Sequence, residues 1–178
     1  MNFELFDEQA YQATIDQWTA EALRHDCFPT EVQTRLSIVG SMLSKPPKER
    51  HTSLAYGVFP SGSKVASCVC DLLLTDRGSF GGKWLKMLKI TLSPEIETLA
   101  SARDQQAMYV AIQSYKAAVL GSFSARLEHE ADTLKLYGRS KEQLDFLSTM
   151  LSVLDEEGSA DVSFKMEGRW LVLRTAKG

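Results

Sequence analysis

The chain has 178 residues, of which 44% are apolar and 24% charged, and its formal net charge is -3. This length and composition suit one compact domain with a sizeable core, so we predict a single domain over residues 1–178. The slightly acidic balance excludes the general attraction to nucleic acid or anionic membranes that a strongly basic protein has.

The first residues carry acid, at Glu4, Asp7 and Glu8, where a secretory signal would carry positive charge. Nowhere does an apolar run approach the roughly 18 to 20 residues that a membrane-spanning helix needs. We therefore expect a cytoplasmic protein without a membrane segment.

Cysteine and histidine spacing predicts neither a disulfide framework nor a metal site. Cys27, Cys68 and Cys70 are an odd number, and Cys68 and Cys70 would share one face of a strand, which is typical of free core thiols. The three histidines lie far apart in the chain, and none has a second ligand at metal spacing. We expect no metal.

The first part of the chain predicts one short strand and two helices. Phe3 to Phe6 is a strand candidate, and Asp7 offers an N-cap to a helix of about 17 residues. That helix repeats apolar residues at helical spacing: Tyr11, Ile15, Trp18 and Ala22. The second helix has the same pattern at Val32, Leu36, Val39 and Leu43, and it ends before Pro46 and Pro47.

A hairpin and a third strand follow. The stretch from Leu54 to Phe59 is strand-like, Pro60 to Ser63 is a turn, and Val65 to Leu74 would pair back on the first strand. Lys83 to Leu92 predicts a third strand that ends at Ser93-Pro94. Lysines at every third position in this segment leave a short amphipathic helix open as an alternative.

The last part of the chain predicts two helices and three strands. Ser101-x-x-Asp104 would open the longest helix, which runs to about Glu128. Leu134 to Tyr137 alternates as a strand, and Ser140-x-x-Gln143 is a capping box for the next helix. A closing hairpin pairs residues 162–166 with residues 170–174. The prediction is an α+β fold: a mixed, mainly antiparallel sheet of about six or seven strands flanked by helices.

This order of elements, β-α-α-β-β-β-α-β-α-β-β, resembles the GNAT family of acyl-CoA-dependent N-acyltransferases over almost the whole chain. The resemblance is carried by the order and length of the elements: the Leu54 to Leu74 hairpin, the Lys83 to Leu92 strand, the long helix, and the Leu134 to Tyr137 strand before the Ser140 helix. It implies acetyl-CoA or another acyl-CoA as cofactor. It also implies that the backbone of Thr91, Leu92 and Ser93 contacts pantetheine.

In that family, a glycine-containing loop after the fourth strand holds the pyrophosphate of acyl-CoA on backbone N–H groups at a helix N-terminus. The matching segment here, from Leu92 to Gln113, contains no glycine and has acids at Glu95, Glu97 and Asp104. Tyr137 lies near the place where many relatives have the tyrosine that protonates the leaving thiolate, so the resemblance gives it the role of general acid.

A second hypothesis is a non-catalytic binding module on the same fold. Lys83, Lys86 and Lys89 with Trp84 form the only basic and aromatic cluster in the sequence, within the segment from Gly78 to Lys89. Such a cluster could contact nucleic acid or an acidic protein surface. No feature of the sequence indicates the oligomeric state, so a homodimer is the default expectation.

Overall fold

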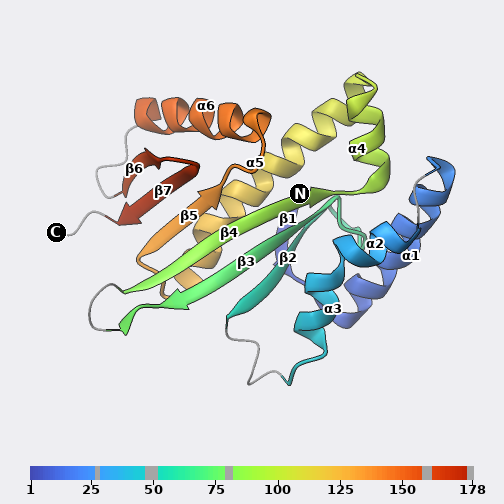
Figure 1. Ribbon diagram of the computed structural model, residues 1–178, viewed down its shortest axis with the longest axis horizontal. Coiled ribbons are helices and arrows are strands. Elements are labelled where there is room, and N and C mark those ends of the chain that lie inside the picture. Colours follow the sequence, from blue (N-terminus) through green and yellow to red (C-terminus); the bar gives the residue numbers. More distant parts are fainter. Residues whose placement is uncertain (27–28, 47–51, 79–81, 158–161, 176–178) are drawn as a thin grey trace. The chain divides into compact units, whose positions relative to one another are not determined.

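The structure is a computed structural model that describes residues 1–26, 29–46, 52–78, 82–157 and 162–175. Within them the strands, labelled in Figure 1, are β1 (Asn2–Leu5), β2 (Ser53–Phe59), β3 (Cys68–Asp76), β4 (Lys83–Leu92), β5 (Thr133–Tyr137), β6 (Val162–Glu167) and β7 (Trp170–Thr175). The helices are α1 (Glu8–Arg24), α2 (Pro29–Arg35), α3 (Ser37–Leu43), α4 (Pro94–Ser101), α5 (Gln105–Glu128) and α6 (Lys141–Glu157). None of these helices combines the length and apolar character needed to cross a bilayer.

The strands form one sheet in the order β1-β2-β3-β4-β5-β7-β6. Strands β4 and β5 run parallel, whereas the pairs β1–β2, β5–β7 and β6–β7 are antiparallel. The predicted α+β class with a mixed, mainly antiparallel sheet is confirmed, and the sheet has seven strands.

The chain divides into two compact units. The first comprises Met1–Leu72 and Ile90–Gly121, and the second comprises Leu73–Lys89 and Ser122–Gly178. The first unit contains β1, β2, α1 to α4 and most of α5, and the second contains most of β4 with β5, α6, β6 and β7. The expectation of a single domain stays a prediction.

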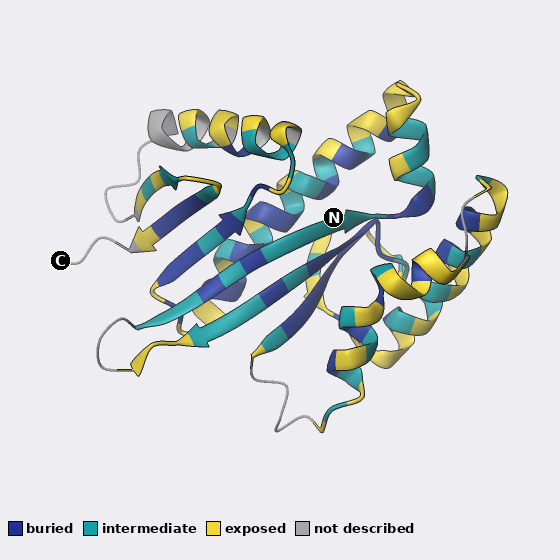
Figure 2. Ribbon diagram, in the orientation of Figure 1, coloured by how far each residue is buried: buried dark blue, intermediate teal, exposed yellow. Residues whose placement is uncertain are grey.

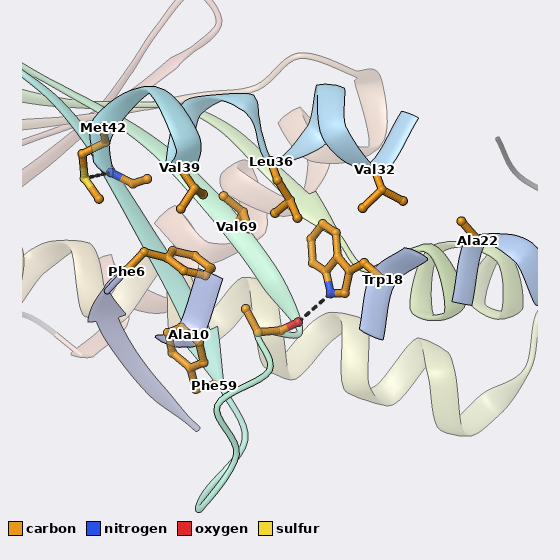
Figure 3. Close-up of a cluster of buried hydrophobic side chains, with 12 residues drawn as sticks. Phe6, Ala10, Trp18, Ala22, Val32, Leu36, Val39, Met42, Phe59 and Val69 are labelled. Carbon is orange, nitrogen blue, oxygen red and sulfur yellow. Dashed lines mark hydrogen bonds between the residues drawn. The ribbon is translucent and has the colours of Figure 1, made fainter. Parts of the chain in front are cut away.

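The core of the first unit forms around Trp18, which is fully buried (Figure 3). Its indole Nε1 donates a hydrogen bond to the carbonyl of Ala66 over 2.9 Å, and the hydroxyl of Thr14 accepts the Ala66 N–H over 3.1 Å. The helical spacing predicted for α1 is confirmed, because Trp18 and Ala22 are buried and Tyr11 packs against the same cluster. Asp7 caps α1 as predicted, with its carboxylate accepting the Ala10 N–H over 2.7 Å.

The strands of the second unit have one apolar face. Two rows of residues in register make it: Leu85, Leu134, Leu173 and Phe164 in one, and Met87, Leu136, Leu171 and Met166 in the other. The five leucines and Met87 are 3% exposed or less, and Figure 2 shows this burial as dark blue bands on β4, β5 and β7. Phe123 of α5 packs edge-to-face on Phe164, with ring centroids 6.2 Å apart.

Three local features differ from the sequence prediction. The expected second helix is two helices, because Leu36 leaves helical geometry (φ -94°, ψ 3°) while its side chain is fully buried. The apolar repeat continues across this break, so periodicity could not show it. The strand expected from Val65 begins at Cys68, because Ser63 and Val65 form a local turn in which the Ser63 hydroxyl accepts the Val65 N–H.

The third difference is α4, which the sequence analysis did not predict. Ser93 and Pro94 end β4, but they also begin a helix: Ser93 is its N-cap, and Pro94 is in its first turn, where proline is favoured. Ser101 is therefore the last residue of α4, and Asp104 caps α5 through the Ala107 N–H. Lys83–Leu92 is a strand, so the helical alternative for this segment is wrong.

Candidate functional site

The end of β4 and the start of α4 contain Thr91, Leu92 and Ser93, the residues predicted to contact pantetheine. Ser93 caps α4 with its own atoms. Its hydroxyl accepts the N–H of Ile96 over 3.3 Å, and its carbonyl accepts the N–H of Glu97 over 3.0 Å. Pro94 has no N–H to offer. Only the N–H of Glu95 remains to be satisfied in this first turn.

Glu21 of α1 satisfies it. The Glu21 Oε2 atom accepts the N–H of Glu95 over 3.3 Å, and its Oε1 atom accepts the side-chain amide of Gln17 over 3.1 Å. Glu21 is 6% exposed, so this carboxylate is nearly buried against the start of α4. The three first-turn N–H groups of α4, at residues 95 to 97, thus all donate to acceptors of the chain itself.

Two ion pairs surround the same helix start. Glu95 pairs with Arg24 of α1 over 2.9 Å, and Glu97 pairs with Arg35 of α2. Arg35 also donates to the carbonyl of Leu92 over 3.5 Å. Since these pairs are partly or largely exposed, they add little to stability, but they hold acidic groups around the helix end.

The next helix start after β4 also has an acid at its N-cap. Asp104 Oδ1 accepts the N–H of Ala107 over 2.8 Å, and the Asp104 carbonyl accepts the N–H of Met108 over 2.9 Å. A helix N-terminus attracts anions through free N–H groups and its positive dipole end. At both starts in the β4–α5 connection a carboxylate of the protein already uses that attraction.

Tyr137, the predicted general acid, is the last residue of β5 and belongs to the second unit. Its ring lies 4.8 Å from that of Trp170, tilted by 46°, and the Arg169 guanidinium lies 5.8 Å from the Tyr137 centroid. The Arg169 Nε atom donates to the carbonyl of Gly138 over 2.9 Å. Tyr137 is therefore part of a half-buried aromatic pair at the end of its strand.

The three lysines of the predicted basic cluster do not share a face of β4. Successive side chains of a strand point to opposite sides, so Lys86 faces away from Lys83 and Lys89. Lys83 Nζ pairs with Glu130 over 2.8 Å, and this hydrogen bond raises the pKa of Lys83 and lowers the pKa of Glu130. Lys86 lies on the Trp84 side of the strand, with its Nζ 5.5 Å from the Trp84 centroid.

Comparison with known proteins shows the fold of this chain. No protein-family model matches the chain, and no curated protein matches it either. Among solved structures it is similar to a probable acetyltransferase, with 10% identity and a TM-score of 0.51 over 94% of this chain and 95% of that one. The chain has a GNAT-like fold. A GNAT family acetyltransferase from Brucella melitensis in complex with acetyl-CoA matches with 13% identity and a TM-score of 0.48, covering 97% of this chain and 86% of that one.

In this chain, β4 is followed directly by the self-capped helix α4. The absence of glycine and the acids at Glu95, Glu97 and Asp104 are visible in the sequence, but no pattern in it points to Glu21, Arg24 or Arg35. Glu21 lies 74 residues before Glu95 in the chain, and no local pattern links the two. Thr91, Leu92 and Ser93 as cofactor contacts and Tyr137 as an acid stay predictions.

Among the residues that the structure describes, no group of three or more histidine, cysteine, aspartate or glutamate side chains is arranged to hold a metal ion.

Proposed function

We propose that this chain uses its GNAT-like fold to bind a macromolecular partner and does not hold acyl-CoA in the manner of the family. The observation that supports this most directly is the closed start of α4, where Glu21 and Ser93 accept the N–H groups of residues 95 to 97.

A pyrophosphate at this position would meet three carboxylates, those of Glu21, Glu95 and Glu97. It would have to displace a nearly buried carboxylate and then leave that charge without its hydrogen bonds. A buried neutral polar group that loses its hydrogen bond destabilises a protein by roughly 1–3 kcal/mol, and a buried charged group destabilises it by more. Arg24 and Arg35 offset the charges of Glu95 and Glu97, so the repulsion of the phosphates comes chiefly from Glu21.

Thermal unfolding with millimolar acetyl-CoA, CoA or adenosine tests the proposal. A ligand at about 100 times its dissociation constant stabilises a folded protein by about 2.7 kcal/mol, which raises the midpoint by a few degrees. We expect no shift with any of the three compounds. A reproducible upward shift with acetyl-CoA and CoA, absent with adenosine, would contradict the proposal.

The second candidate is an acyl-CoA-dependent N-acyltransferase with an altered cofactor site. Its support is the likeness to a probable acetyltransferase along nearly the whole of both chains. In that case Tyr137→Phe should reduce the rate of CoA release from acetyl-CoA in the presence of an amine acceptor, while the acetyl-CoA thermal shift is kept. If acetyl-CoA causes no thermal shift and no CoA is released in the presence of the acceptor, the acyltransferase candidate is wrong.

A further inference from the structure

The second unit has a basic and aromatic face opposite its apolar one. Along each strand, the residues that alternate with those of the apolar rows point to the opposite side of the sheet. They form three rows in register across β4, β5, β7 and β6: Trp84, Thr133, Arg174 and Ser163; then Lys86, Lys135, Val172 and Lys165; then Tyr137, Trp170 and Glu167. We refer to these residues, with Arg77 beside Trp84, as the basic face.

Three cations gather around one indole ring on this face. The Nζ of Lys135 lies 4.1 Å from the Trp84 centroid, the Arg77 guanidinium carbon 4.6 Å, and the Nζ of Lys86 5.5 Å. The ring attracts each cation, but the cations repel one another. An anion placed among them would remove that repulsion.

Only one carboxylate of the basic face opposes its five cations. Glu167 pairs with Lys135 over 3.6 Å and with Arg174 over 3.2 Å. Lys165 is exposed, and the Arg174 side chain is 49% exposed. The chain as a whole has a net charge of -3, so positive charge is concentrated on this face against the overall balance. The face is therefore complementary to an extended anionic partner.

Aromatic rings adjoin these cations. Tyr137 and Trp170 form the third row with Glu167, next to the row of Lys135 and Lys165. With strands about 4.8 Å apart, four strands spread the cations over about 14 Å of sheet. A flat strand surface with cations for phosphates and aromatic rings for bases is the arrangement that binds single-stranded nucleic acid.

We propose that the basic face binds single-stranded nucleic acid through phosphate contacts to Arg77, Lys86, Lys135, Lys165 and Arg174 and through base stacking on Tyr137 and Trp170. This inference rests on the proposed binding function and names the class of partner. It differs from the cluster expected from the sequence, because Lys83 and Lys89 are on the opposite side of β4 and Lys135, Lys165 and Arg174 are added.

The test is fluorescence anisotropy with labelled single-stranded oligonucleotides of about 20 nucleotides, poly-dT and poly-U, titrated with the full chain. For three to five phosphate contacts, the logarithm of the binding constant should fall against the logarithm of salt concentration with a slope of about -2 to -3.5. A duplex of equal length and poly-glutamate serve as competitors, and both should compete at least tenfold more weakly.

Two variants remove exposed cations of the basic face: Lys165→Glu alone, and Lys165→Glu with Arg174→Glu. We expect weakening of at least threefold for the single and at least tenfold for the double variant, with unfolding midpoints close to that of the parent. Lys116→Glu, which reverses an exposed lysine on α5, is the matched control and should bind like the parent.

The inference is overturned if oligonucleotides fail to bind at about 50 mM salt, if poly-glutamate competes equally well, or if Lys116→Glu weakens binding as much as the double variant. These outcomes leave the acetyl-CoA test untouched, so failure of this inference and failure of the proposed function are distinguishable. A thermal shift with acetyl-CoA would contradict the proposed function whatever the oligonucleotides do.

Discussion

Glu21 is the residue on which the closed start of α4 depends most. Replacing it with alanine leaves the partly buried Glu95 N–H without its acceptor. We expect Glu21→Ala to lower the free energy of unfolding by about 1–3 kcal/mol. Glu21→Gln retains an acceptor oxygen and should lose less than half as much. Urea denaturation measures the free energy of unfolding of both variants, and Glu4→Ala, at an exposed position, is the control. Equal losses of stability for Glu21→Ala and Glu21→Gln would contradict this role.

The two buried cysteines are a second case at the residue scale. Burial, followed by a hydrogen bond and charge interaction with Cys68, raises the pKa of the Cys70 thiol well above its ordinary value. Only the thiolate reacts readily with disulfide reagents. Cys27 is outside the described residues, so the test uses a Cys27→Ser background. In this background we expect no reaction of the native protein with Ellman's reagent between pH 7 and 9. Both thiols should react once the chain unfolds, and rapid native labelling would show that this strand opens.

At the scale of elements, a strand and a helix of the first unit make a close contact at Gly121 of α5. A Cβ atom at this position would overlap the Phe3 side chain of β1, and Phe3 stacks on Tyr56 with ring centroids 4.7 Å apart. Helix propensity alone favours alanine over glycine by about 1 kcal/mol. Overpacking against the ring should outweigh it, since such clashes cost about 1–3 kcal/mol.

We therefore expect Gly121→Ala to destabilise the protein in the parent and to destabilise it less in a Phe3→Ala background, which removes the ring but keeps the Phe3 Cβ atom in overlap with the added Cβ atom. Chemical denaturation of the four proteins of this double-mutant cycle measures the coupling. If Gly121→Ala stabilises both backgrounds, the close approach of β1 and α5 is wrong.

The elements also show what a sequence can and cannot predict. The long periodic helices, Lys83–Leu92 and the closing hairpin were predicted because alternation and helical spacing are local properties. The helix α4 was missed because Ser93-Pro94 is compatible both with the end of a strand and with the start of a helix. The sequence cluster of Lys83, Lys86 and Lys89 did not show which of these lysines share a face, because a spacing of three residues places side chains on one face in a helix but on two in a strand.

For the whole molecule, the order of elements was enough to predict a GNAT-like fold, whereas the candidate site was not predictable. Its decisive contact, between the Glu21 carboxylate and the Glu95 N–H, joins two helices that are distant in the sequence. The basic face likewise depends on strand register, which places Lys135 beside Lys86 and Lys165 two strands further on. A shared fold therefore does not determine which groups occupy a given position in it.

If the start of α4 is closed to anions, its backbone N–H groups should not respond to phosphates. The most direct test follows the backbone amide resonances of Glu95, Ile96 and Glu97 by two-dimensional NMR while pyrophosphate, and then CoA, is added to millimolar concentration. We predict that these three resonances stay in place in the parent. Saturable shifts of the three amides, larger than those elsewhere in the chain, would show that phosphates bind there and would contradict the account.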